Sequence, residues 1–153
     1  MDSERVAEYV EVAVDRPLTA GAGETVSADE QEDVATFAAA RNVVPILTHA
    51  SYLINLATTN REFHAKSIAA MVDELDRAER LGIHAVVLHP GAHLNAGADA
   101  GLDQIARSLD QIHAAIPDHR VMTLLETAAG QGSCVGCTFA ELGRIIDLVD
   151  DKR

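Results

Sequence analysis

Apolar and polar positions alternate between strand-like and helix-like patterns along the chain. Residues 8–14 (EYVEVAV) alternate in a way typical of a strand, and a loop containing Pro and Gly follows. Residues 27–41 open with Ser27 and Glu30 at the spacing of a capping box, which predicts a first helix. Residues 43–48 (VVPILT) predict a second strand, although Pro45 cannot donate a hydrogen bond to a central ladder.

Residues 60–81 carry the clearest helical pattern, and Gly82 supplies a C-terminal stop. A strand (85–88), a helix (101–116), a further strand (121–125) and a last helix are predicted after it. Thr138 and Glu141 form a second capping box at the start of that last helix. We expect its apolar residues to face inward, namely Leu142, Ile145, Ile146 and Val149.

This order, in which strand and helix alternate four times, predicts an α/β fold. Such alternation implies parallel strands joined by crossover helices, either in an open doubly wound sheet or in part of a barrel. We expect residues 1–153 to form a single domain, because a chain of 153 residues that is 48% hydrophobic can bury one compact core.

The charge and composition of the chain make several classes of protein function and location less consistent with the sequence. The formal net charge of −12 argues against a surface that attracts nucleic acid as a whole, so any nucleic-acid site has to be local. No apolar run approaches the length of a membrane span and no secretion signal is evident, which predicts no membrane partner and a cytoplasmic location. Cys134 and Cys137 are too few for a disulfide framework; their C-x-x-C spacing is weak evidence for a metal or redox site.

Three predicted strands end in the sequences LTH, VLH and LLE, so His49, His89 and Glu126 each follow the carboxyl end of a successive strand. Neighbouring parallel strands lie about 5 Å apart, and a zinc-like ion binds imidazole and carboxylate at about 2.0 to 2.2 Å, so the three side chains can converge on one ion. Two histidines and a carboxylate are a common catalytic set that leaves room for a water. A single such histidine is more often a satisfied polar group, but three in register favour a metal site.

The segments that follow these residues contain no further acidic side chain: ASYLINLATTNR, PGAHLNAGA and TAAGQGSCVGC. Their small residues allow a phosphate or sugar to approach the backbone, although polar turns of this kind are also ordinary in α/β proteins. His93 lies on such a turn, where contact with a phosphate and simple solvation are equally plausible readings. The remaining histidines fall on helices or helix ends and are expected at the surface, namely His64, His84, His113 and His119.

A resemblance to a known family is carried by the segments HASYLINL, HPGAHL and ETAAGQGS and by the closing IIDLVDDKR. Through these segments the chain resembles the endonuclease IV (deoxyribonuclease IV) family of apurinic/apyrimidinic endonucleases. The resemblance is strong from about Asp33 to the end, whereas residues 1–26 match poorly. It implies a TIM-type (β/α)8 barrel of the xylose isomerase-like kind, with a trinuclear zinc centre that cleaves DNA 5′ to abasic sites in base-excision repair.

The resemblance also implies roles for individual residues. His49 and His89 would hold one zinc ion, and Glu126 would bridge it to a second, so these three are the expected catalytic and metal-binding residues. Tyr52 and Leu53 would enter the DNA around the lesion. His93 and Gln131 are the other residues expected at the substrate, which would be DNA containing an abasic site.

Departures from the family pattern limit these expectations. The first strand and the later Asp, His and Glu ligands have no counterpart, so the chain looks like a fragment covering strands two to five, about half a barrel with one zinc site. Ala92 and Ala128 stand where the family usually has Ser and Thr. A half-barrel leaves two strand edges unpaired, which a homodimer would close.

Three readings therefore remain open. The first is an abasic-site endonuclease that is incomplete or inactive as an isolated chain, unless the missing ligands come from elsewhere. The second is a non-catalytic half-barrel that binds one metal ion or has a structural role. A weaker third reading is a fragment of a barrel similar to the sugar isomerases, which also place His and Glu at strand ends.

Overall fold

The computed structural model describes residues 36, 38, 40–42 and 45–152, of which residues 36, 38, 40 and 41 are helical. The strand predicted at 8–14 and most of the helix predicted at 27–41 lie outside the described residues. The elements that follow are β1 (Leu47–His49), α2 (Arg61–Arg80), β2 (Ala85–Leu88), β3 (Gly91–Ala92), α3 (Ala98–Ala115), β4 (Met122–Leu125), β5 (Cys134–Val135) and α4 (Phe139–Leu148).

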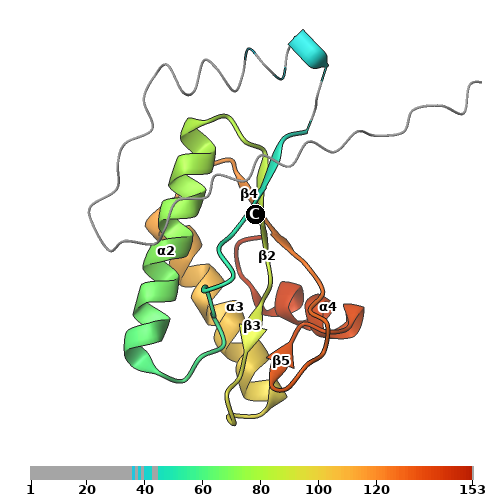
Figure 1. Cartoon of the computed structure of the whole chain (residues 1–153). Helices are drawn as coiled ribbons and strands as arrows, with labels where there is room; N and C mark the ends of the chain where they lie inside the picture. The colour runs from blue at the N-terminus through green and yellow to red at the C-terminus, as the bar shows by residue number, and fades with distance from the viewer. Residues whose placement is uncertain (1–35, 37, 39, 43–44, 153) are drawn as a thin grey trace, which may run out of the picture.

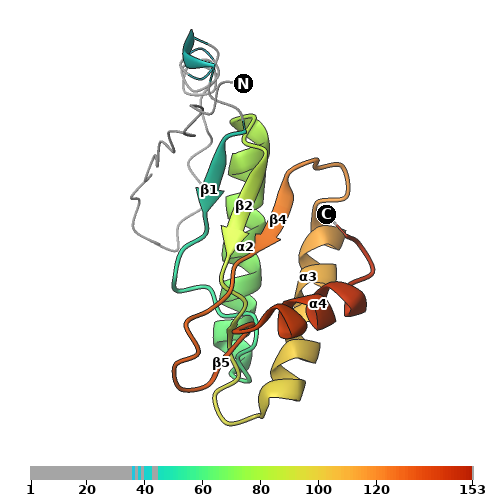
Figure 2. The same ribbon diagram turned by 90° about the vertical axis from the view of Figure 1, so that its right-hand side faces the viewer.

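Strands β1, β2 and β4 form a parallel sheet in that order, so the predicted parallel βα arrangement is confirmed. Figure 2 shows the three strands side by side and pointing the same way, with α2 behind them and α3 to one side. In Figure 1 the same sheet is seen nearly edge-on, with α2 on one side and α4 on the other. Within the described residues, this is a segment of a parallel βα barrel.

The two faces of this sheet differ in burial. Val86 and Leu88 of β2 are 0% and 1% exposed and belong to the core shared with the helices. The opposite face carries Leu47, Met122 and Leu124, which are exposed to 41%, 46% and 36%. Because side chains alternate along a strand, the residues just after β2 and β4 also project from this exposed face. The face that would line the inside of a barrel is therefore open.

The helix boundaries follow local capping chemistry. Asn60 caps α2 by accepting hydrogen bonds from the backbone N–H groups of Glu62 and Phe63, and Gly82 (φ +68°) follows its C-terminus. The predicted capping box of Thr138 and Glu141 at α4 is confirmed.

Helix α3 begins at Ala98, three residues before the predicted start at residue 101. Ala98 and Ala100 have high helix propensity, which extends the helix past Gly101. The sequence pattern did not predict this earlier start, because the small residues interrupt the apolar stripe and are typical of a loop.

Three expectations about burial or strand extent were wrong. Ile146 was expected to face inward but is 50% exposed. His113 was expected at the surface but is 4% exposed. Its Nδ1 lies 3.1 Å from the carbonyl oxygen of Asp151, and its Nε2 lies 3.3 Å from Thr123 Oγ1. Both ring nitrogens therefore keep a hydrogen-bond partner when the side chain is buried. Strand β1 starts only at Leu47, after Pro45, in keeping with the poor fit of proline to a ladder.

Strands β3 and β5 form a two-residue antiparallel pair that the sequence pattern did not predict. The pair joins the segment after β2 to the segment after β4, beyond the end of the main sheet (Figure 1). No helix among the described residues is long and apolar enough to cross a membrane.

Candidate metal centre

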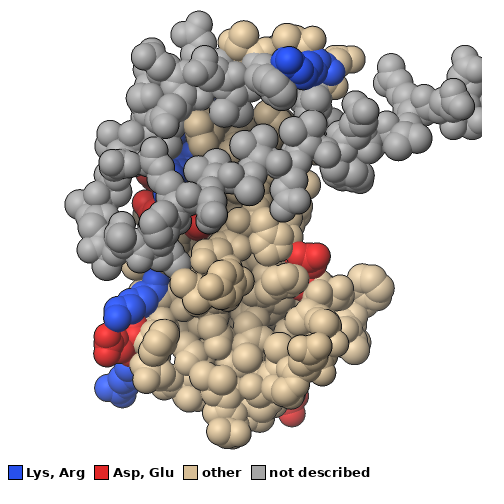
Figure 3. Space-filling model, viewed as in Figure 1, with Lys and Arg blue, Asp and Glu red and all other residues tan. Residues whose placement is uncertain are grey.

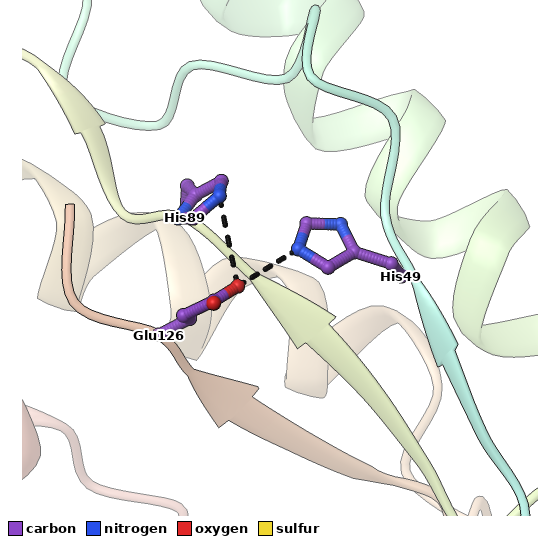
Figure 4. A group of neighbouring side chains, drawn as sticks. All are labelled: His49, His89 and Glu126. Carbon is purple, nitrogen blue, oxygen red and sulfur yellow. Dashed lines mark hydrogen bonds and ion pairs between the residues drawn. The ribbon is translucent and has the colours of Figure 1, made fainter. Parts of the chain in front are cut away.

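His49, His89 and Glu126 come together at the carboxyl end of the sheet (Figure 4). His49 is the last residue of β1, and the other two directly follow β2 and β4. The parallel pairing continues past the strands, since the N–H of Glu126 donates to the carbonyl of Leu88. All three side chains project from the open face of the sheet and remain close to half exposed, at 43%, 47% and 48%.

The distances between the donor atoms suit a single metal ion. His49 Nε2 lies 2.9 Å from Glu126 Oε2, and His89 Nε2 lies 3.6 Å from the same oxygen. One ligand atom from each residue lies within 4.8 Å of the others. Two ligands at about 2.1 Å from a tetrahedral ion are roughly 3.4 Å apart, so these two contacts lie on either side of the spacing that zinc requires.

The two nitrogens of the His49 ring face different partners. Its Nδ1 lies 2.9 Å from the carbonyl oxygen of Ala50, while its Nε2 faces the carboxylate of Glu126. A ring that donates its Nδ1–H to this carbonyl presents the lone pair of Nε2 toward Glu126, which is the form of histidine that binds a metal ion. A ring nitrogen held by a backbone carbonyl is also the usual way in which a ligating histidine is oriented.

Asn55 fixes the two segments that flank the site. Its Oδ1 accepts hydrogen bonds from the N–H groups of Ala92 (2.9 Å) and Ala57 (3.0 Å), and its Nδ2 donates to the carbonyl of Ala92 (3.1 Å). The segment after β1 is thereby attached to β3, directly beyond His89. Sequence reasoning missed this residue, because its partner lies 37 positions away.

Two glycines permit the close packing of these segments. A Cβ on Gly91 (φ +128°) would lie 2.4 Å from Asn55 Oδ1, and a Cβ on Gly136 (φ +77°) would lie 2.5 Å from Pro90 Cγ. Both the left-handed backbone and the lack of space therefore require glycine at these positions. The segments after β1, β2 and β4 are thus packed directly against one another around the metal centre.

Tyr52 and Leu53 lie at the tip of the segment between β1 and α2, exposed to 87% and 55%. A turn closed by the N–H of Ile54 donating to the carbonyl of Ser51 forms the base of this tip. Ile54 itself is 5% exposed and packs in the core. The two apolar side chains at the tip are therefore held on an anchored base and are available to a partner.

His93 and Gln131 lie on the two segments joined by β3 and β5. His93 is half-buried, accepts a hydrogen bond from the N–H of Gly97 on Nδ1, and donates its own backbone N–H to the carbonyl of Ser133. Gln131 is exposed, and its carbonyl accepts from the N–H of Cys134. Neither residue belongs to the group of three metal-binding candidates.

Cys134 and Cys137 are free thiols and lie outside the cluster of possible metal ligands found among the described residues. Burial raises the pKa of the Cys137 thiol, with further contributions from Glu141 and Cys134. A raised pKa disfavours the thiolate that redox or metal chemistry needs.

Charged side chains are sparse on the face shown in Figure 3. Lys and Arg alternate with Asp and Glu beside α2, whereas the lower part of this face is mostly uncharged. The described surface in this view therefore offers no broad basic patch, in agreement with the negative net charge of −12. Attraction of a polyanion to this side would depend on bound cations or on local arginines.

Comparisons with known proteins agree with this geometry. A family model described as "Xylose isomerase-like TIM barrel" matches residues 7–153. The chain is 42% identical over 125 residues to the "Probable endonuclease 4" of Nitratidesulfovibrio vulgaris (strain Hildenborough), which covers 80% of this chain and 44% of that protein. It is 48% identical over 106 residues to the "Probable endonuclease 4" of Halorhodospira halophila, covering 69% of this chain and 36% of that protein.

The chain is also similar to solved structures. Endonuclease IV from Thermus thermophilus matches with a TM-score of 0.69 and 30% identity over 80% of this chain and 43% of that one. A D-tagatose 3-epimerase-like protein matches with a TM-score of 0.66 at 22% identity, covering 82% of this chain and 48% of that one, which shows a shared fold alone. The chain spans less than half the length of all four relatives. It belongs to the xylose isomerase-like TIM barrel family, and the resemblance to endonuclease IV seen in its motifs is confirmed.

Proposed function

We propose that this chain carries part of the active site of a zinc-dependent apurinic/apyrimidinic endonuclease, which cleaves the DNA phosphodiester 5′ to an abasic site in base-excision repair. The observation that carries the proposal is the convergence of His49, His89 and Glu126 at the carboxyl end of the sheet. The names of the relatives add the endonuclease activity. Abasic DNA as the substrate and a cytoplasmic location are parts of this proposal.

In this proposal His49, His89 and Glu126 hold one zinc ion. The ion would supply Lewis-acid polarisation of the scissile phosphate and acidify a water. The carbonyl of Ala50 orients the His49 ring, so that Nε2 faces the metal position. Nearly half of each ligand side chain is exposed, which leaves the site open to a macromolecular substrate.

Tyr52 and Leu53 would contact the DNA where the missing base leaves a gap. An abasic site leaves a gap in the base stack, and the exposed aromatic and aliphatic side chains on an anchored turn can fill that space. Gln131, and His93 through its half-exposed ring, would contact the backbone beside the lesion. Because His93 Nδ1 already accepts from the N–H of Gly97, its contact with a phosphate would use Nε2.

The three ligands support one zinc ion, so further ligands have to come from outside this segment. We propose that a second copy of the chain covers the open face of the sheet. Leu47, Met122 and Leu124 are exposed on that face, and a cavity of about 310 Å³ lies between β4 and α4 beside it. The aligned segment covers 44% of one relative, so two copies would bring nearly the length of one complete relative.

An incision assay tests the proposed activity. An oligonucleotide duplex with one abasic site is incubated with the chain, with and without added zinc. We expect zinc-dependent cleavage 5′ to the lesion, lost in His89→Ala and Glu126→Ala and retained in His84→Ala, whose ring lies outside the cluster. Cleavage that persists in both ligand variants would refute the proposed roles.

A non-catalytic half-barrel is the second candidate. It is favoured by the open apolar face of the sheet and by the small number of ligands in the described residues. Zinc binding without any incision by the wild type, under conditions where a complete relative is active, would support this candidate over the enzyme.

Light scattering at micromolar concentration tests the second copy. A dimer that dissociates in Met122→Asp is expected, because a carboxylate in that face would be desolvated on pairing. A monomeric mass for the wild type would contradict the proposed pairing.

A further inference from the structure

A second polar cavity lies on the outside of the barrel segment, between α2 and α3. It has a volume of about 300 Å³, and its lining includes Thr58, Arg61, His64, Gln104 and Arg107. No Asp or Glu lines it. We refer to it as the α2–α3 pocket. It is built from the connections after β1 and β2, the first turn of α2 and the first three turns of α3.

The two arginines of this pocket differ from other cations of the chain. Lys66, Arg77 and Arg80 each form an ion pair with a carboxylate one turn earlier on α2. In the described part of the chain, no carboxylate lies within ion-pair distance of Arg61 or Arg107. In a protein of net charge −12, two uncompensated guanidinium groups at one cavity are a local positive site in an otherwise acidic surface.

A hydrogen-bond network holds one side of the pocket in place. Arg107 Nη2 donates to Gln104 Oε1 at 3.1 Å, and Gln104 Nε2 lies 3.0 Å from His64 Nε2. His64 Nε2 in turn lies 2.7 Å from Ser108 Oγ, and Ser108 is 1% exposed and bonded to the carbonyl of Leu56. The Arg107 side chain is therefore connected to the core through three partners, which reduces the entropy lost when it binds a ligand.

We propose that the α2–α3 pocket binds a phosphate group through the guanidinium groups of Arg61 and Arg107. Planar guanidinium groups form paired, charge-assisted hydrogen bonds with phosphate oxygens. The neighbouring N-terminus of α2 adds favourable partial positive charge, because the pocket lining includes its first residue. The same chemistry serves a free phosphate compound or a backbone phosphate of DNA. The proposal does not depend on the metal centre.

Binding measurements in the presence of EDTA separate this pocket from any zinc site. Pyrophosphate, followed by calorimetry, represents a free phosphate compound, and a fluorescein-labelled undamaged duplex, followed by anisotropy, represents DNA. The test variant is R61Q/R107Q. The charge-matched control is R80Q/R120Q, which removes Arg80 at the C-terminal end of α2 and Arg120 in the connection between α3 and β4.

We expect the wild type to bind at least one probe, and R61Q/R107Q to weaken that binding about tenfold or more, while the control changes it far less. For the duplex, the slope of log K against log salt should fall by about 1.8, which corresponds to two lost phosphate contacts. R61K/R107K keeps the charge and should restore part of the affinity. Pyrophosphate binding identifies a free phosphate ligand, and binding of the duplex alone identifies a backbone contact.

Equal effects of the two double variants, or no binding of either probe by the wild type, would overturn the proposal. Thermal melts of both variants verify that folding is retained, as expected for side chains at the edge of a pocket. Because the metal is absent throughout, loss of binding here and loss of zinc-dependent incision in the ligand variants are separate outcomes.

Discussion

Replacement of Asn55 by alanine should loosen the segments around the metal centre and destabilise the fold. The side chain makes three hydrogen bonds of 2.9 to 3.1 Å, two to the backbone of Ala92 and one to the N–H of Ala57. At about 1 kcal/mol net for each bond, the expected loss is about 3 kcal/mol. This is a large share of the about 5 to 15 kcal/mol that stabilise a typical domain.

Urea unfolding at pH 7, monitored by circular dichroism, measures this loss in the free energy of unfolding. Gln111→Ala removes an exposed amide from α3 and should change the free energy of unfolding by no more than about 0.5 kcal/mol. Asn55→Asp keeps the acceptor for the N–H groups of Ala57 and Ala92 but places a carboxylate oxygen against the carbonyl of Ala92, so it should not restore stability. An Asn55→Ala variant as stable as Gln111→Ala would refute the assigned role of this side chain.

Three further changes test other parts of the fold. Asn60→Ala removes the cap of α2 and should cost about 1 kcal/mol in urea unfolding; an unchanged midpoint would contradict the cap. Ile105→Ala removes a side chain that is 0% exposed and should cost about 2 to 5 kcal/mol by the same measurement. Glu79→Gln should be less stable than the wild type at pH 7, with the difference shrinking as the pH falls below about 4. Burial acts to raise the pKa of Glu79, but hydrogen bonds from the N–H groups of Arg120 and Val121, together with the charges of His119 and Arg120, outweigh it and lower that pKa. The carboxylate therefore stabilises the fold above its unfolded pKa, and this contribution is lost as the pH falls through the folded pKa; a difference independent of pH would contradict it.

Much of the fold could be predicted because its signals are local. The helical stripe and cap of α2, the capping box of α4 and the apolar run of β2 each depend on neighbouring residues, and all three elements are observed. The meeting of His49, His89 and Glu126 could also be anticipated, because parallel strands bring their carboxyl ends to one edge.

Features that depend on distant partners could not be predicted in this way. His113 is buried because Thr123 and the carbonyl of Asp151 satisfy its ring, and neither contact follows from the helical pattern around it. Asn55 and His64 likewise depend on partners 37 and 40 or more residues away. The short β3–β5 pair has too few residues to show any periodicity.

Equilibrium dialysis against zinc, with metal analysis of the protein fraction, tests the central claim most directly. The account predicts one zinc ion per chain for the wild type, none for Glu126→Ala or for His49→Ala/His89→Ala, and one for the matched control His84→Ala/His119→Ala. Zinc binding that is absent from the wild type, or that survives loss of these ligands, would contradict the account.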